Sequence, residues 1–374
     1  MKKNFLLCLS LLAFICGGTS ALAGSVKIGL MAPLTLAYAS EGEDMRRVVS
    51  LLADEINKNG GINGNMIEIV VQDDGSDPKT AAQAAQQLAT LGVSAVIGTY
   101  GSAVTEASQN IYNRNGMLQI ATGSTSLRLS EKGFKLFFRT CPRDDDQGKV
   151  AVNTLRKMGY KKIAILHDNT AYASGLAEEI RDGLAKAGIT RLAAYHALQP
   201  GERDYSAILT RIRNANPDVI FYTGYYPEAG MLLRQMREMK WKVPMIGGDA
   251  TNNADLVKIG GVDAVSGFHF ISPPMPGDLD SQTNRDFINA YQAKYNSMPS
   301  LWSVFAGDAL KVIVEAMRAT GTDAVKMAAY LHDKLKDFDG LTGKISFDAK
   351  GDRVGDLYRL YMVDAKGQFI LQPK

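Results

Sequence analysis

The sequence is poor in cysteine. It has three cysteines in 374 residues, and Cys8 and Cys16 both lie in the N-terminal stretch of residues 1–23. A chain without that stretch keeps Cys141 alone, which excludes an intrachain disulfide. We interpret Cys141 as a small buried residue rather than as a nucleophile.

The motifs of the common nucleotide and hydrolase sites are also absent. No G-x-G-x-x-G follows the first expected strand, and the chain has no P-loop, no G-x-S-x-G and no H-E-x-x-H. Its four histidines are scattered at spacings unlike a metal site. His167 and Asp168 follow one expected strand, but a structural histidine is favoured there because no nucleophile accompanies it. We therefore expect no metal, no cofactor and no catalytic residue.

Charge of one sign is not in excess. Lysine and arginine number 42 against 39 acidic residues, and no long run of like charge occurs. This balance argues against nucleic acid or a membrane surface as partner. The hydrophobic content is 46%, as in globular proteins, and the length suits two domains rather than one.

The one long apolar run stands at the N-terminus. Lys2 and Lys3 precede an apolar segment from Phe5 to Ile15, and Ala21-Leu22-Ala23 is a small-x-small cleavage site. This pattern predicts a secretory signal peptide over residues 1–23, cleaved after Ala23. A lipoprotein anchored at Cys16 is the alternative, which the bulky Ile15 before it disfavours.

Short apolar runs and amphipathic segments alternate along the rest of the chain. Strands are expected at 26–31, 66–72, 95–98, 118–121, 162–167, 192–195, 219–222, 245–247, 266–271, 344–347 and 357–363. Helices are expected at 44–57, 79–91, 147–158, 175–187, 205–214, 282–295, 300–319 and 323–335. The alternation predicts an α/β protein with two halves, each a parallel sheet with helices on both faces. The late helices are expected to return to the first half, so that several crossings form a hinge.

Two neighbouring strand ends are rich in small and hydroxyl residues. Residues 95–106 turn through Gly101 into a helix, with Ser102 as the expected N-cap, and residues 118–126 follow the next strand. The ends of parallel strands lie at one edge of a sheet, where ligands bind. We expect the two turns, with the free N–H groups of the helix, to hold one carboxylate. Ordinary capping is the alternative for either turn alone.

Aromatic side chains and one carboxylate collect at other expected loops. The aromatic residues are Tyr100, Tyr172, Tyr225, Tyr226 and Trp302, and Asp249 follows a strand of the second half. A carboxylate opposite hydroxyls and helix N–H groups is the complement of a zwitterion. Exposed loop tyrosines, and Asp249 capping a short helix, are the alternatives.

Several motifs in order carry a resemblance that runs from Val26 to Phe369. They are residues 56–64 (INKNGGING), Asp73-Asp74 with Asp77-Pro78-Lys79, Asp146-Gln147-Gly148, His167-Asp168 with residues 172–177 (YASGLA), and residues 224–228 (GYYPE). In these the chain resembles the leucine/isoleucine/valine-binding family of type I periplasmic solute-binding proteins, the receptors of ABC importers.

The resemblance implies two Rossmann-like lobes joined by a three-strand hinge, with a free amino acid closed between them. Residues 24–142 plus 273–354 would form the N-terminal lobe, and 143–272 plus 355–374 the C-terminal lobe. It also implies a monomeric periplasmic protein that hands its ligand to an ABC permease in the inner membrane.

The resemblance also implies a role for each site residue. Ser102 and Thr125, with the N–H of Thr125 and the carbonyl of Gly123, would hold the ligand's carboxylate and ammonium from the first lobe. Tyr225 and Asp249 would bind the ammonium from the second. The walls of the side-chain pocket would be Tyr100, Gly101, Ser124, Tyr172 and Trp302.

The chain departs from the family in three places. Glu41 stands where the family has an aromatic wall, and Tyr38 is a candidate to replace that wall. Ser76 and Gly101 occupy the positions of a family disulfide, and Asp249 replaces a glutamate. Zwitterion capture is unaffected, whereas the side-chain preference is left open between an apolar ligand and, if Glu41 points inward, a polar or cationic one.

We therefore expect a receptor for a free amino acid, branched-chain aliphatic or aromatic. One alternative is a sensory receptor of the same fold that binds an amide, urea or aromatic acid. Another is an exported α/β hydrolase that uses His167 and Asp168.

Overall fold

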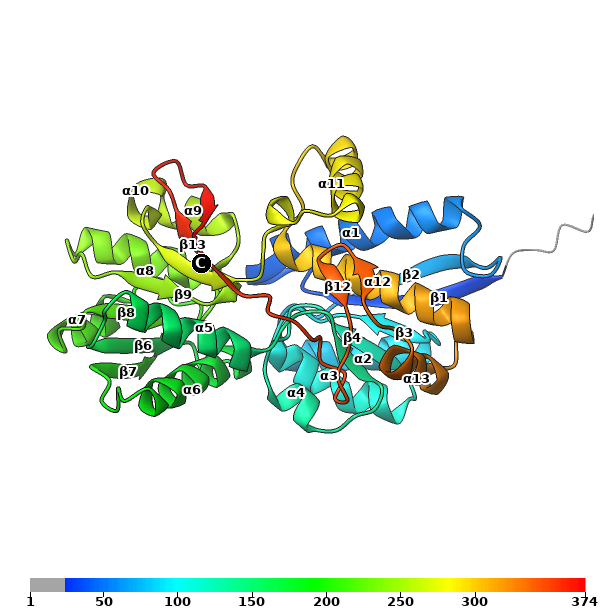
Figure 1. The fold of residues 1–374 in the computed structure, drawn as a ribbon, viewed down its shortest axis with the longest axis horizontal. Coiled ribbons are helices and arrows are strands. Elements are labelled where there is room, and N and C mark those ends of the chain that lie inside the picture. Colours follow the sequence, from blue (N-terminus) through cyan, green and yellow to red (C-terminus); the bar gives the residue numbers. More distant parts are fainter. Residues whose placement is uncertain (1–23, 374) are drawn as a thin grey trace, which may run out of the picture.

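The computed structural model describes residues 24–373. The expected signal peptide, residues 1–23, and its cleavage site lie outside the described residues. Within the described part, no helix has the length and apolar character needed to cross a membrane. The molecule is elongated, with one α/β unit at each end of its long axis (Figure 1).

The first unit, which we call the N-terminal lobe, is built on a five-stranded sheet in the order β2-β1-β3-β4-β5. All four neighbouring pairs are parallel. The strands are β1 (Ser25–Ala32), β2 (Met66–Asp73), β3 (Ala95–Ile97), β4 (Leu118–Ala121) and β5 (Phe137–Arg139).

Helices cover both faces of this sheet because its central strands are apolar on both sides. Ile28 and Leu30 of β1 pack in the same core cluster as the long helices α1 and α12, whereas Met31 faces α2 and α3. The helices of this lobe are α1 (Ala39–Lys58), α2 (Pro78–Thr90), α3 (Ser102–Arg114), α4 (Arg128–Glu131), α11 (Gln282–Tyr295), α12 (Leu301–Thr320) and α13 (Ala324–Asp333), with the 3₁₀ turns η1 (Leu36–Tyr38) and η3 (Pro276–Asp278). A two-stranded ribbon of β11 (Phe338–Gly340) and β12 (Gly343–Ile345) follows them.

The second unit, the C-terminal lobe, has a seven-stranded sheet in the order β14-β13-β10-β9-β8-β6-β7. The strands β6 (Ile163–His167), β7 (Ala194–Ala197), β8 (Val219–Tyr222), β9 (Met245–Gly247) and β10 (His269–Ser272) are parallel. The last two, β13 (Arg359–Val363) and β14 (Phe369–Leu371), join antiparallel at one edge.

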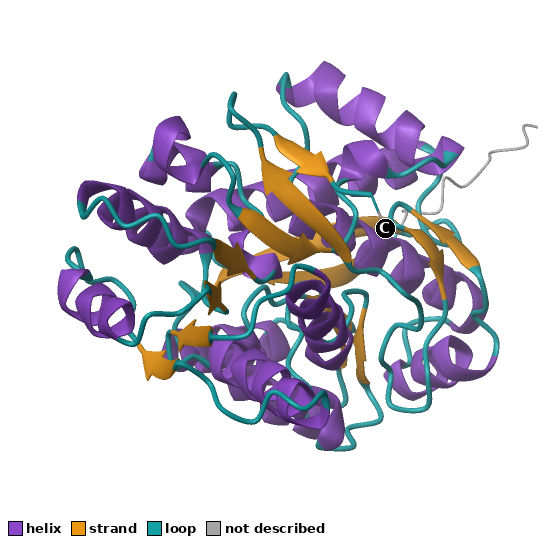
Figure 2. Ribbon diagram, turned by 60° about the vertical axis from the view of Figure 1, so that its left-hand side comes forward, coloured by secondary structure: helices purple, strands orange, loops and turns teal. Residues whose placement is uncertain are grey.

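Helices also cover both faces of the second sheet. Figure 2 shows strands enclosed between layers of helices. Ile163 and Ile165 share a core with α5 and α6, and Ala164 and Leu166 share another with α7, α8 and α9. The helices are α5 (Asp144–Lys157), α6 (Ala171–Lys186), α7 (Ser206–Asn214), α8 (Tyr226–Glu238), α9 (Asp255–Gly260) and α10 (Val262–Val265), with the 3₁₀ turn η2 (Asp249–Thr251). The expected α/β fold with two parallel-sheet halves is confirmed.

The two sheets share one plan. In the first, β1 lies between β2 and β3, and in the second, β6 lies between β7 and β8. In each case the chain reverses its winding direction beside the first strand, which creates a crevice at the carboxyl ends of the strands.

Between residues 24 and 373 the chain passes from one lobe to the other three times. The connections lie between β5 and α5, between β10 and η3, and between β12 and β13. Residues 140–143, 273–275 and 354–358 carry no regular strand. The three connections are therefore irregular segments next to strands, rather than the hinge strands that the resemblance implied.

Some element boundaries differ from those expected. Helix α1 begins at Ala39 instead of residue 44, and it includes Gly42. A Cβ at Gly42 would lie 1.9 Å from the carbonyl oxygen of Pro33. Glycine therefore allows the helix to pack closely against the residues after β1, and it does not interrupt the helix. Strand β10 begins at His269 instead of Ser266, because Ser266 and Gly267 form a turn in which Gly267 has φ +84°. The three-residue strands β5, β11 and β14 were not expected.

Candidate ligand-binding site between the lobes

The carboxyl ends of the two sheets face each other, and buried aromatic rings contact across the junction. Tyr100, after β3, lies 5.9 Å (ring centroids) from Tyr225, which follows β8. Tyr172 of α6 lies 5.3 Å from Tyr225, and Trp302 of α12 lies 6.1 Å from Tyr100. All four side chains are at most 6% exposed, so they are not the exposed loop residues of the alternative interpretation.

In the N-terminal lobe, hydroxyl groups tie the two expected turns together. The Oγ1 of Thr105 lies 2.5 Å from Oγ1 of Thr99 and 2.6 Å from Oγ of Ser124. The Oγ of Ser102 accepts a bond of 3.2 Å from the N–H of Ser126. The sequence-based expectation that Ser102 is the N-cap of α3 is wrong, because Gly101 is the N-cap and Ser102 is the first helical residue. Its side chain joins the neighbouring turn instead.

Gly123 and Thr125 shape the second turn. A Cβ at Gly123 would lie 2.8 Å from the Tyr100 ring and 2.9 Å from its carbonyl oxygen, so the backbone approaches this ring as only glycine can. The Oγ1 of Thr125 is buried and makes no hydrogen bond of good geometry among the described residues, with the Asp144 carboxyl as its polar neighbour. The Tyr100 hydroxyl and the Trp302 Nε1 are also buried without a hydrogen-bond partner among the described residues. Three polar atoms at this junction are thus available to a polar ligand.

In the C-terminal lobe, Asp249 is the central charged group. It is 1% exposed, and its Oδ1 and Oδ2 accept bonds of 2.8 Å from the hydroxyls of Tyr172 and Tyr358. No ion pair within residues 24–373 includes it, so its charge is balanced by no protein cation. Burial raises the pKa of Asp249 to about 6, although both tyrosine hydrogen bonds oppose that shift.

Asp249 does not act as the helix cap of the alternative interpretation. It is the first residue of η2 and Gly248 is the N-cap, so Asp249 does not occupy the capping position; the N-cap of the next helix, α9, is Ala254. Its backbone N–H donates to Oε1 of Gln147 at 3.2 Å. The turn is therefore fixed by α5, and the carboxylate is left to the tyrosines.

Three residues of this centre were missed by sequence reasoning. Tyr358 lies in the third connection, Gln147 was quoted only within a motif, and Asp144 begins α5. Asp144 is fully buried, and its carboxylate makes no hydrogen bond of good geometry among the described residues; the Thr125 hydroxyl is the polar group beside it. Burial and the nearby charge of Asp249 hold the pKa of Asp144 well above its usual range. The run Asp144-Asp145-Asp146 at a helix start was the only sequence signal.

Glu41 and Tyr38 occupy the place where the family was expected to have an aromatic wall. The Tyr38 ring lies 4.7 Å from the Tyr225 ring and 5.8 Å from the Tyr100 ring. Glu41 points inward and is fully buried, but both of its oxygens accept bonds from protein, at 2.6 Å from Asn253 Nδ2 and 2.8 Å from Ser300 Oγ. The aromatic surface here is therefore supplied by Tyr38.

His167 and Asp168 do not form a hydrolytic pair. The Nδ1 of His167 accepts a bond from the N–H of Asn169 at 3.3 Å, and Asp168 accepts one from the N–H of Thr170 at 2.9 Å. Cys141 is fully buried, its thiol 3.5 Å from the Ser124 carbonyl, as expected of a small core residue. In the described part of the chain, no group of three His, Cys, Asp or Glu residues could hold a metal ion.

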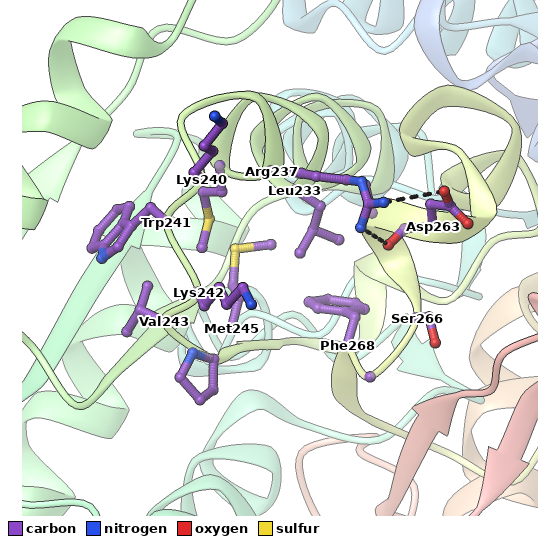
Figure 3. Close-up of a pocket in the computed structure, with 14 residues that line it drawn as sticks. Leu233, Arg237, Lys240, Trp241, Lys242, Val243, Met245, Asp263, Ser266 and Phe268 are labelled. Atoms are coloured by element: carbon purple, nitrogen blue, oxygen red, sulfur yellow. Dashed lines mark hydrogen bonds and ion pairs between the residues drawn. The ribbon is translucent and has the colours of Figure 1, made fainter.

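A separate groove of about 750 Å³ lies on the outer side of the C-terminal lobe, between α8, α10 and the start of β9. Figure 3 shows Arg237 paired there with Asp263, at 3.1 Å between Nη2 and Oδ2. The groove is at the amino end of β9, opposite the end that carries Asp249. None of its lining side chains is a buried polar group without a partner, so the junction of the lobes is the better candidate site.

Comparisons with known proteins agree with this geometry. The family described as "Periplasmic binding protein" matches residues 25–368. "Leu/Ile/Val-binding protein homolog 1" of Brucella abortus is 34% identical over 377 residues, which cover 100% of both chains. The "Leucine-, isoleucine-, valine-, threonine-, and alanine-binding protein" of Pseudomonas aeruginosa is 33% identical over 336 residues, which cover 89% of this chain and 88% of that one.

A solved structure shows the same architecture. The branched-chain amino acid transporter substrate binding protein LivJ from Streptococcus pneumoniae, in complex with isoleucine, superposes with a TM-score of 0.85 at 31% identity, covering 92% of this chain and 97% of that one. With two lobes of one plan, a buried site at their facing strand ends and a family match over nearly the whole chain, the protein belongs to the periplasmic binding protein family.

Proposed function

We propose that the protein is the substrate-binding component of an ABC importer and captures a free amino acid between its lobes by closure. The observation that carries this proposal is Asp249, a buried carboxylate that no protein cation balances. It faces a lobe that offers hydroxyl groups and the start of α3. Such a site is the electrostatic complement of a zwitterion, because a ligand that lacks either charge would leave one side unpaired.

We assign the ligand's carboxylate to the N-terminal lobe and its ammonium to groups of both lobes. The carboxylate is bound by Ser102, by Thr125 and by the N–H of Thr125. The ammonium is bound by the Gly123 carbonyl, Tyr225 and Asp249. Two observations support the assignment. The Thr125 hydroxyl is buried without a hydrogen-bond partner of good geometry. The Tyr225 hydroxyl of the other lobe also lies close to the first turn, since a Cβ at Gly101 would be only 3.6 Å from it.

We propose that the bound side chain is apolar, branched-chain aliphatic or aromatic. Its walls are the residues that the aromatic contacts bring together, with two small neighbours: Tyr100, Gly101, Ser124, Tyr172 and Trp302. Glu41 offers it no free oxygen, which speaks against a cationic ligand. The relatives support the choice, since one is named for leucine, isoleucine, valine, threonine and alanine, and another was solved with isoleucine.

The remaining assignments follow from this role. We propose that residues 24–142 plus 273–354 and residues 143–272 plus 355–374 move as the two lobes, which the division of strands between the sheets supports. We further propose that residues 1–23 direct export to the periplasm, where a monomer cleaved after Ala23 delivers its ligand to an inner-membrane permease. The protein breaks no bond and needs no cofactor or metal.

A thermal-shift screen of refolded, ligand-stripped protein tests the proposal. Ligand held at a hundred times its dissociation constant adds about 2.7 kcal/mol to the free energy of unfolding. We expect a shift with leucine, valine or phenylalanine and none with the corresponding amines or keto acids. A shift with an aromatic acid, an amide or urea, and none with any amino acid, would contradict the proposed ligand.

A further inference from the structure

A single carboxylate connects the two lobes beside the site. Glu41 belongs to α1 of the N-terminal lobe, and its Oε1 accepts from Nδ2 of Asn253 at 2.6 Å. Asn253 follows η2, the turn that begins with Asp249. The other oxygen of Glu41 accepts from Oγ of Ser300, the N-cap of α12, at 2.8 Å. Glu41 thus bridges the turn that carries Asp249 and the helix start that carries Trp302.

Both donors are held in place by their own lobes. The Oδ1 of Asn253 accepts from the N–H of Asp255 at 2.7 Å, and the N–H of Ser300 donates to the carboxylate of Asp44. When the lobes separate, Ser300 therefore stays with Glu41, and Asn253 leaves with the C-terminal lobe. The bond between Glu41 and Asn253 exists only when the lobes are together.

A second polar contact crosses at the same place. The hydroxyl of Tyr226, the first residue of α8, donates to the carbonyl of Ala37 at 3.0 Å and lies 3.2 Å from the Ser40 Oγ. Residues 37–41 of the N-terminal lobe therefore form a polar seam with the other lobe, beside the ring contact of Tyr38 with Tyr225.

We propose that Glu41 and Asn253 form a latch that stabilises the closed arrangement of the lobes whatever side chain the ligand carries. The latch rests on the proposed function, since it positions Asp249 and Trp302 for the bound amino acid. Glu41 is a positioning residue and not a ligand contact, because both of its oxygens are already bound to protein.

The surroundings of Glu41 couple the latch to pH. The titratable groups that face it are all acidic or phenolic: Asp44 on α1, Asp255 on α9, Tyr100 after β3 and Tyr226 on α8. Lys258 is the nearest cation on α9, and it pairs with Asp255 at 2.6 Å. Burial raises the pKa of Glu41 to about 7. Closure therefore takes up a proton, so that the closed state is favoured below the ordinary glutamate pKa and loses this advantage as pH rises through about 7.

A substitution cycle tests the latch with L-leucine as probe, in isothermal titration calorimetry. Asn253→Asp keeps the acceptor for the N–H of Asp255 but removes the donor and places an acid against Glu41, so we expect affinity to fall by about tenfold or more. The double variant Glu41→Gln/Asn253→Asp exchanges donor and acceptor and should recover most of that loss. Asp249 titrates in both proteins, so the comparison isolates Glu41: the affinity of the wild type relative to Glu41→Gln should fall between about pH 6 and pH 8.5.

The matched control is Glu43→Gln. Glu43 lies two residues along α1, is partly exposed, and forms ion pairs with Arg46 and Arg47 of the same helix, so this variant should bind as the wild type does. If Asn253→Asp binds normally, or if the double variant binds no better than Asn253→Asp, the latch is wrong.

A ligand-free measurement separates failure of the latch from failure of the proposed function. If the wild type binds no amino acid, the proposed function fails, and small-angle X-ray scattering then tests the latch alone. Asn253→Asp should have a larger radius of gyration than the wild type, and the double variant should return toward the wild-type value. Equal radii in all three proteins would overturn the latch.

Discussion

Replacing Asp249 by asparagine should move ligand affinity and ligand-free stability in opposite directions. The change removes the charge that we assign to the ammonium and keeps the size of the side chain, while the hydroxyls of Tyr172 and Tyr358 remain as partners. Loss of one member of a buried charge pair costs about 3–5 kcal/mol, which is a hundredfold or more in the dissociation constant. Titration calorimetry with L-leucine measures that loss.

The ligand-free variant should nevertheless unfold at a higher temperature than the wild type. Burial raises the pKa of Asp249 from 3.8 to about 6, and a shift of about two units corresponds to a penalty of about 3 kcal/mol on the ionised form. Asparagine carries no such penalty. Because the pKa is raised in the folded state, the penalty is absent below about pH 4 and complete above about pH 6.

The thermal advantage of the variant should therefore be present at neutral pH and disappear near pH 4, as differential scanning calorimetry would measure. Asp182→Asn is the control, since Asp182 is an exposed residue of α6 that pairs with Arg181. Unchanged affinity for Asp249→Asn would place the ammonium elsewhere. A parallel loss of affinity and stability would show that Asp249 is structural, and would refute the electrostatic reasoning.

Two further predictions follow from the same centre. Tyr358→Phe removes the donor to Oδ2 of Asp249 and should weaken L-leucine binding by about tenfold, while Tyr330→Phe, whose hydroxyl bonds Glu315 on the outside of the N-terminal lobe, should have no effect in the same calorimetry; equal affinities would exclude Tyr358 from the site. Cys141 is fully buried, and burial raises its thiol pKa to about 12, so in the chain from residue 24 a thiol reagent should label it only in denaturant; rapid labelling of the native protein would contradict its burial.

The parts of the fold that sequence predicted are those that local patterns determine. Strands such as β1 and β6 contain short apolar runs, residues 28–32 and 163–166, and the turns after β3 and β4 carry their own glycines and hydroxyl residues. The strand ends that line the junction could therefore be found without a structure. Strand β5 could not, because it has three residues and includes the buried Arg139. That guanidinium is balanced by a 2.5 Å ion pair with Asp352, more than 200 positions away, and donates further hydrogen bonds to the turn after β4 and to α4.

The same limit applies to the candidate site. Ser102, Thr125 and Asp249 stand beside recognisable turns, whereas Tyr358 reaches Asp249 from an irregular connection that has no pattern of its own. The sequence also left open whether the Glu41 side chain points inward. The partners that fix its direction, Asn253 and Ser300, belong to two different lobes. Contacts of this range depend on tertiary structure, and no local rule predicts them.

The division of the N-terminal lobe between two distant segments has a consequence for the order of folding. Its sheet is complete by Arg139, but α12, which packs on α1 and on the inner face of that sheet, begins only at Leu301. The five parallel strands of the C-terminal lobe and their helices are contiguous from Asp144 to Ser272. During synthesis, the lobe that starts second can therefore be nearly finished while the lobe that starts first still exposes an apolar face. The nascent chain is most prone to aggregate in that interval, and chaperone binding would protect it most there.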